Sequence, residues 1–345
     1  MLRRILVAVV LAAFCSSSFA GQKPPPTPIA DHLSVEMLLE QQEIQADSSS
    51  SAMVGAQFGL IGALISSAVD NAAAKKAQAR VAPLRDALVD YPFNERFERA
   101  IRSRMPADGI SPDPVVTVLT KPWSAADGDR MPRTALVLTP KYALSFNSSR
   151  IYVTVQVAYV TREIRKDKIK ARIPSWRRYS FEFEIPADKD VDANTAKWVA
   201  MPQRALKSML DEAIDNVADM IVFDYSVEGR AGWSTKARKM KTSFEGRTLA
   251  GQEVRRGDGW IWLRGGAHST NVPGSYALIS EGIVGYRAID PNALPPKYME
   301  ANAVGSMPSQ APSIPAPVKE SATDAVGGTK ASGDVAAPAS QGKPA

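Results

Sequence analysis

Residues 151–160 read I-Y-V-T-V-Q-V-A-Y-V, and residues 179–185 read Y-S-F-E-F-E-I. Both stretches alternate apolar with more polar side chains, the period-two pattern of a strand that buries one face. Two shorter apolar stretches, at 115–119 and 134–138, precede them. Together they predict an antiparallel sheet with one buried face.

A long amphipathic helix is predicted to cover that face. Over residues 194–223, apolar side chains recur every three or four positions, as in a helix with one buried stripe. Pro202 marks a kink in this helix. The fold class is therefore α+β, a sheet layer under a helix layer. The polar side of the helix is predicted to be a solvated acidic face, formed by Asp211, Glu212, Asp215 and Asp219.

The sequence before this domain contains an Ala/Gly-rich helix pattern. Residues 52–69 carry no charge, and Gly55, Gly59 and Gly62 fall on one helical stripe that permits close approach of a neighbour. Three interpretations remain open: packing in the core or against a second copy in a homo-oligomer, insertion into a membrane surface, and a membrane-spanning segment. These glycines are the candidate helix-packing or membrane contacts.

The N-terminus has the features of a secretory signal peptide. Arg3 and Arg4 precede an apolar run too short to span a bilayer, and a small-residue cleavage site ends at Ala20. We expect cleavage before Gly21, which removes Cys15, the only cysteine of the 345-residue chain. A cysteine-free exported protein forms no disulfide, which favours the periplasm of a bacterial envelope over eukaryotic secretion, since secreted eukaryotic domains of this size usually carry disulfides.

Changes in composition divide the chain further. Gly257-Asp258-Gly259 is a hairpin signal inside a Trp-containing stretch, and residues 276–279 form one more short strand pattern. The predicted organisation is a signal peptide (1–20), a linker and short N-terminal segment (21–51), the Ala/Gly-rich apolar helix (52–80), an α+β domain (81–228), a small β module (229–290) and a disordered Pro/Ala/Ser-rich tail (291–345).

Catalytic motifs are absent from the sequence. The two histidines, His32 and His268, lie far apart, and no phosphate-binding glycine loop or nucleophile elbow occurs. We therefore predict no catalytic residues, no cofactor and no metal site. A hydrolase with an unlocated pair of carboxylates remains an alternative.

The charge that stands out is basic. Residues 162–178 carry eight basic side chains against Glu163 and Asp167, within a chain of formal net charge +6. This segment should form a hairpin tip, and its basic side chains are candidate contacts for an anionic surface such as phospholipid head groups. Export argues against nucleic acid as the partner. The candidate contacts are Arg162, Arg165, Lys166, Lys168, Lys170, Arg172, Arg177 and Arg178.

Several short sequences resemble a group of uncharacterised exported proteins of proteobacteria: G-L-I-G-A-L-I with A-P-L-R-D-A-L, V-L-T-P-K-Y-A-L-S, and Y-S-F-E-F-E-I-P with A-N-T-A-K-W. The resemblance covers residues 52–225. It implies an envelope location and a shared fold, and it carries no activity.

The sequence therefore predicts a periplasmic structural or interaction protein without catalytic activity. Its partner would be an envelope protein or an anionic membrane surface, reached through the 52–69 helix and the basic hairpin. An accessory subunit of an envelope transport or secretion complex is the second alternative, beside the hydrolase.

Overall fold

The computed structural model describes residues 33–47, 69–106, 110–165, 168–233, 240–265 and 282–299. Several predicted features lie outside these residues: the signal peptide with Ala20 and Gly21, the glycine stripe at Gly55, Gly59 and Gly62, Lys166, and the tail after residue 299. The described end of the predicted Ala/Gly helix is α3 (Val69–Ala87), which continues beyond the expected boundary at residue 80.

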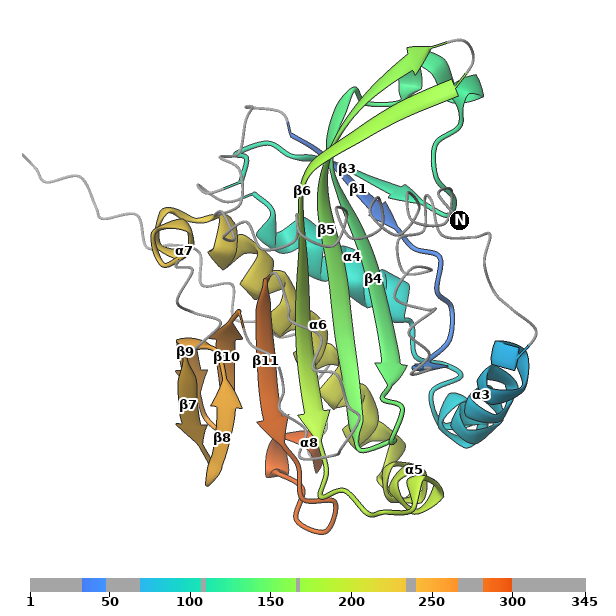
Figure 1. Ribbon diagram of the computed structural model, residues 1–345, viewed down its shortest axis with the longest axis vertical. Coiled ribbons are helices and arrows are strands. Elements are labelled where there is room, and N and C mark those ends of the chain that lie inside the picture. Colours follow the sequence, from blue (N-terminus) through green and yellow to red (C-terminus); the bar gives the residue numbers. More distant parts are fainter. Residues whose placement is uncertain are drawn as a thin grey trace, which may run out of the picture. The chain divides into compact units, whose positions relative to one another are not determined.

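Within the described residues, nine strands form the main sheet, in the order β3-β1-β4-β5-β6-β11-β10-β9, with the short β2 also paired to β4 (Figure 1). A separate two-stranded sheet joins β7 (Lys241–Phe244) to β8 (Arg247–Ala250). The strands of the main sheet are β1 (Ser34–Leu38), β2 (Gln45–Ala46), β3 (Val115–Leu119), β4 (Thr134–Leu144), β5 (Arg150–Arg165), β6 (Lys168–Glu184), β9 (Gln252–Gly257), β10 (Trp260–Arg264) and β11 (Ile283–Ala288).

The sheet is mixed, so the prediction of an antiparallel sheet is wrong as a description of the whole. The predicted strands β4, β5 and β6 do form an antiparallel meander. However, β1 is parallel to both β3 and β4, and β11 is parallel to β6. Parallel pairing requires a crossover connection. The chain makes one through α3 and α4 (Phe93–Arg104) between β1 and β3.

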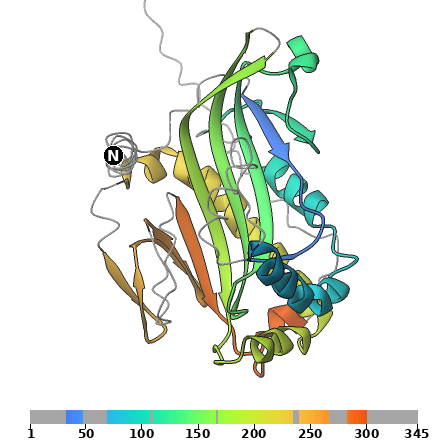
Figure 2. The ribbon, with the colours of Figure 1, turned by 45° about the vertical axis from the view of Figure 1, so that its right-hand side comes forward.

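The buried face of the sheet is covered by α6 (Gln203–Tyr225), which packs on β5, β6 and β11 (Figures 1 and 2). The predicted helix over 194–223 is instead two helices, because α5 (Val191–Val199) ends before Pro202 and α6 begins after it. Proline lacks the N–H that a helix interior needs, and it disfavours helical geometry in the preceding residue. A short α7 (Val227–Ala231) follows α6.

Side chains of the sheet's inner face are fully removed from solvent. Val153, Val155 and Val157 of β5 and Phe181 and Phe183 of β6 are each 0% exposed. These are the alternating apolar positions that the sequence pattern assigned to the buried face, so that part of the prediction is confirmed.

The acidic stripe of α6 is not the solvated face that we predicted. Arg104 of α4 reaches Asp215 at 2.9 Å and Asp219 at 2.6 Å, and the Tyr91 hydroxyl donates to Asp211 at 2.8 Å. Asp215 and Asp219 therefore face α4 and join the two helices, whereas Glu212 pairs with Arg287 of β11 and Lys297 of α8. The spacing of these acidic residues suits pairing with a neighbouring helix. The sequence of α6 alone does not show that such a helix is present.

Strands β9, β10 and β11 of the predicted small β module extend the main sheet, while β7 and β8 form the separate two-stranded sheet. The hairpin at Asp258 and Gly259 is confirmed, since β9 and β10 pair around it and Gly259 has a φ of +66°. Strand β10 then pairs with β11, which pairs with β6. The strand predicted at 276–279 lies outside the described residues, whereas β11 was not predicted.

The C-terminal boundary also differs from the prediction. Residues 291–299, assigned to the disordered tail, include helix α8 (Pro296–Met299). Tyr298 is 1% exposed and donates to Glu212 of α6 at 2.7 Å. The fold therefore includes these residues, because one aromatic side chain and its hydroxyl fasten them to α6.

A substitution at Gly285 tests the placement of β11 beneath α6. A Cβ at this position would lie 2.2 Å from a ring carbon of Phe181 and 2.4 Å from the methyl group of Met220. We expect Gly285→Ala to lower the free energy of unfolding by about 1–3 kcal/mol through overpacking. Urea unfolding followed by circular dichroism measures this. Unchanged stability would mean that β11 does not approach the helix this closely.

Candidate functional surfaces: a projecting basic hairpin and a polar sheet face

Strands β5 and β6 continue beyond their neighbour β4. Thr134, the first residue of β4, pairs with Thr161, yet β5 runs on to Arg165. Beyond that point β5 and β6 pair with each other, from Thr161 opposite Arg172 to Arg165 opposite Lys168. We call residues 161–173 the arm; Figure 1 shows it projecting from the end of the sheet.

A register shift between Tyr159 and Thr161 marks the base of the arm. Between the flanking pairs, Val160 on β5 lies opposite two residues on β6, which is the pattern of a β-bulge. Below the bulge, odd-numbered residues of β6 share a face with odd-numbered residues of β5. The extra residue in β6 reverses this relation. Beyond the bulge, odd-numbered residues of β6 therefore join even-numbered residues of β5.

The arm consequently separates its side chains by character, because directly opposed residues of antiparallel strands share a face. One face carries Ile164 opposite Ile169 and, at the base, Arg162 opposite Ala171, and alternation adds Ile173. Ile164 is 43% exposed and Ile173 is 47% exposed. The other face carries Glu163 and four exposed basic side chains: Arg165, Lys168, Lys170 and Arg172.

Those four residues are the predicted surface contacts that the structure places together on the arm, while Lys166 lies outside the described residues. Arg162 has a different position. Its two terminal nitrogens donate to the two carboxylate oxygens of Glu36, each at 2.7 Å, and the side chains are 10% and 1% exposed. A bidentate, largely buried pair of this kind fixes the base of the arm to β1.

Arg177 and Arg178 lie outside the arm, so the structure places these two and the Glu36-paired Arg162 apart from the four exposed basic residues. Arg177 is 5% exposed, and its guanidinium lies 4.4 Å from the centre of the Trp233 ring. Burial lowers the pKa of Arg178, although Tyr152 and Asp47 nearby act against this effect.

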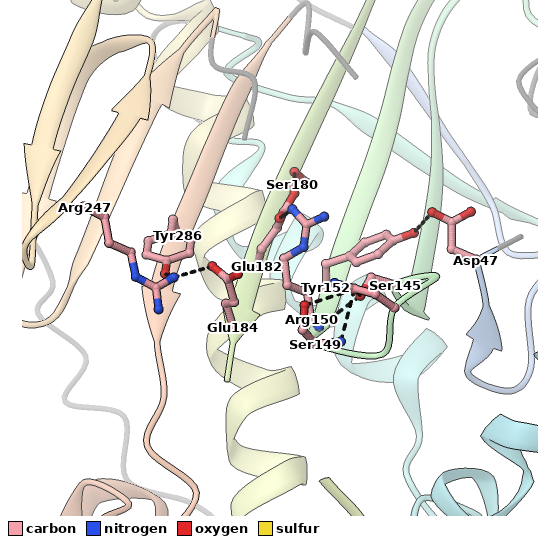
Figure 3. Close-up of polar contacts among 11 residues, drawn as sticks. Asp47, Ser145, Ser149, Arg150, Tyr152, Ser180, Glu182, Glu184, Arg247 and Tyr286 are labelled. Carbon is pink, nitrogen blue, oxygen red and sulfur yellow. Dashed lines mark hydrogen bonds and ion pairs between the residues drawn. The ribbon is translucent and has the colours of Figure 1, made fainter. Parts of the chain in front are cut away.

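The polar face lies on the side of the sheet opposite α6 (Figure 3). In the β5–β6 ladder, Arg150 lies opposite Glu184 and Tyr152 lies opposite Glu182. Arg150 Nη1 donates to Glu182 at 3.1 Å, and Arg247 Nη1 from β8 donates to Glu184 at 2.7 Å. Carboxylates and guanidinium groups thus alternate across the strands, and each of these charged groups lies beside one of opposite charge.

At the β4 side of this face, the Tyr152 hydroxyl donates to Asp47 Oδ2 at 2.9 Å. Burial raises the pKa of Asp47. The hydrogen bond from Tyr152 and the charge of Arg178 lower this pKa by less, so the net shift is upward. Burial and the neighbouring Asp47 carboxylate also raise the pKa of Tyr152 well above 10. Tyr152 therefore stays protonated and acts as a donor.

A second buried network closes the far end of α6. Asp224 is 0% exposed and accepts from Tyr179 Oη at 2.8 Å, Trp233 Nε1 at 2.8 Å and Arg264 Nη2 at 3.1 Å. Burial raises the pKa of Asp224, and the charge of Arg264 opposes this shift. The network joins β6, β10 and the C-terminal end of α6. Its role is therefore structural, because it holds these three elements together.

Neither surface supplies a metal site among the residues that the structure describes, where no group of three His, Cys, Asp or Glu side chains is placed to hold an ion. The described helices include none with the length and apolar character needed to cross a bilayer. Comparison with protein-family models, curated proteins and solved structures finds no match.

The pH dependence of stability tests the environment of Asp47. Because its pKa is raised from 3.8 on folding, its contribution to stability falls as pH rises through and above that value. Asp47→Asn removes the charge and keeps an oxygen to accept from Tyr152. We expect the variant to have a larger free energy of unfolding than the natural protein at pH 7, with the difference vanishing below about pH 4.

Chemical unfolding at pH 7, 5 and 3.5 measures this difference. Asp86→Asn, at an exposed side chain of α3, controls for the loss of a carboxylate. A variant of Asp47 that is less stable than the natural protein at pH 7 would show that the ionised carboxylate stabilises the fold.

Proposed function

We propose that this protein is an exported, periplasmic envelope protein without catalytic activity, which attaches to an anionic lipid surface through the arm. The observation that carries the proposal is the arm itself. It extends beyond the sheet and exposes four basic side chains on one face and isoleucines on the other.

The two faces of the arm supply two kinds of attraction. Each Lys or Arg close to an anionic membrane contributes about 1 kcal/mol. Burying one exposed isoleucine side chain contributes up to about 1.5–3 kcal/mol, less whatever part is already covered. A hairpin that offers both at one tip can enter the head-group region with its apolar face while its long basic side chains reach the phosphates.

The base of the arm supports this role because it is anchored to the fold. The Glu36–Arg162 pair joins the arm to β1, and Arg162 N also donates to the Arg133 carbonyl at 2.7 Å. The arm therefore keeps a defined direction relative to the sheet. A contact element held this way loses less conformational entropy on binding than a flexible loop of the same composition.

Vesicle binding tests the arm. We expect the combined change Arg165→Gln, Lys168→Gln, Lys170→Gln and Arg172→Gln to weaken binding to phosphatidylglycerol vesicles by up to about a thousandfold, since about 4 kcal/mol of attraction is removed. Co-sedimentation over a range of lipid concentrations measures the affinity.

The matched control neutralises four exposed basic residues elsewhere in the fold, Lys75, Lys76, Lys189 and Arg204. It makes the same change in net charge and should reduce binding far less. Equal losses in the two variants would attribute binding to net charge alone, and unchanged binding of the arm variant would contradict the proposal.

The export part of the proposal has its own test. The chain expressed in a Gram-negative host should appear in the osmotic-shock fraction with Gly21 as its first residue, because signal peptidase cuts after the small-residue site ending at Ala20. N-terminal sequencing of that fraction measures this. Recovery of the uncut chain from the cytoplasm alone would exclude export by this signal.

A further inference from the structure

Strand β3 forms one edge of the main sheet. This strand lies at the end of the main sheet and pairs with β1 in parallel, from Val115 opposite Ser34 to Leu119 opposite Leu38. Within the described part of the chain, no strand pairs with its other side. Val115 is 53% exposed and Val118 is 37% exposed, so the strand is accessible along its length.

Backbone hydrogen bonds show which groups point outward. Val115 N donates to the Leu33 carbonyl at 2.9 Å, and Leu39 N donates to the Leu119 carbonyl at 2.8 Å. Alternation along a strand assigns the backbone groups of residues 115, 117 and 119 to β1. The N–H and C=O groups of Val116 and Val118 therefore face away from the sheet, where another strand could pair with them.

The two ends of the sheet differ in protection. β9, the strand at the opposite end, reads Q-E-V-R-R-G and carries three charged side chains. β3 reads V-V-T-V-L, with no charge, no proline and no register shift against β1. Natural proteins protect exposed edges with charges, prolines or bulges, because an unprotected edge pairs with other chains. Only β9 has that protection in its sequence.

We infer that a second copy of this chain pairs with β3, antiparallel, about a two-fold axis at Thr117. In this register Val116 lies opposite Val118 of the second copy, and Val115 lies opposite Leu119. Val116 and Val118 are the residues whose backbone groups point outward, so each opposed pair exchanges two N–H···O=C bonds. The sequence V-V-T-V-L thus opposes an apolar residue to an apolar residue at every position except the axis, where Thr117 lies opposite its own copy.

The residues flanking β3 are also complementary in this arrangement. Asp113 and Lys121 stand at equal separation from Thr117 in the sequence, and both are exposed. Antiparallel pairing about Thr117 brings the acidic end of one strand to the basic end of the other, on both sides of the axis. Symmetric dimers use one patch on both subunits, which must therefore be self-complementary in this way.

Pairing of this kind would join the two sheets into one. Directly opposed residues of antiparallel strands share a face, so both copies would carry α6 on the same side of the joined sheet. The dimer would then carry two arms. Vesicle binding of such a dimer would be strengthened by having two contacts. The dimer itself does not depend on the proposed function.

Disulfide trapping tests the register in the full chain carrying Cys15→Ser. Thr117 lies on the axis as a non-hydrogen-bonded pair, in which Cα atoms are about 4.5 Å apart and within disulfide range. We expect Thr117→Cys to form a disulfide dimer under mild oxidation. Val118→Cys, the matched control, should not, because residue 118 lies opposite residue 116 of the second copy.

Sedimentation velocity tests the contact without cysteine. The natural protein should sediment as a dimer, and Val118→Pro should be a monomer, because proline removes an outward N–H while the bonds to β1 remain. Asp113→Lys should weaken dimerisation at least tenfold, and adding Lys121→Asp should restore it. A natural protein that is monomeric at 50 µM would overturn the inference, as would a disulfide dimer of Val118→Cys without one of Thr117→Cys.

Discussion

The burial of one sheet face under α6 is the interaction on which the rest of the structure depends. The valines of β5 and the phenylalanines of β6 are fully buried there. Because the apolar surface is concentrated on one side, the opposite face of β5 and β6 can carry arginine, glutamate and tyrosine. The same two strands, already held by this core, can extend past their neighbours and form the arm without a core of its own.

Ion pairs connect the remaining elements to this core. Glu36 holds the base of the arm to β1, Arg104 holds α4 to α6, and Asp224 closes the end of α6 over β6 and β10. In the two largely buried pairs, Glu36–Arg162 and Asp224–Arg264, removing one partner leaves an uncompensated charge, so these pairs specify positions more than they add net stability. Several charged residues are therefore anchors between elements of the fold, in contrast to the exposed basic residues of the arm.

This division explains how much could be predicted from the sequence. Strong period-two and helical patterns revealed β5, the apolar half of β6 and the helix that covers them. β1 reads S-V-E-M-L and β11 reads I-V-G-Y-R-A, and neither shows a clear strand pattern. Glu36 and Arg287 occupy strand positions because each meets an opposite charge distant in the sequence, Arg162 and Glu212 respectively. The longer parallel pairings of the sheet are made by these two strands, and its mixed character was not predicted for that reason.

The basic segment shows the same limit at the candidate site. Arg162, Arg165 and Arg177 are indistinguishable in a sequence, yet one is paired with Glu36, one is exposed on the arm and one is stacked on Trp233. Hydrogen–deuterium exchange, with and without phosphatidylglycerol vesicles, tests whether the arm is the part of the protein that meets the membrane. Vesicles should slow exchange in residues 161–173 and leave β4 and α6 unchanged. Slowed exchange elsewhere, with the arm unaffected, would contradict this expectation.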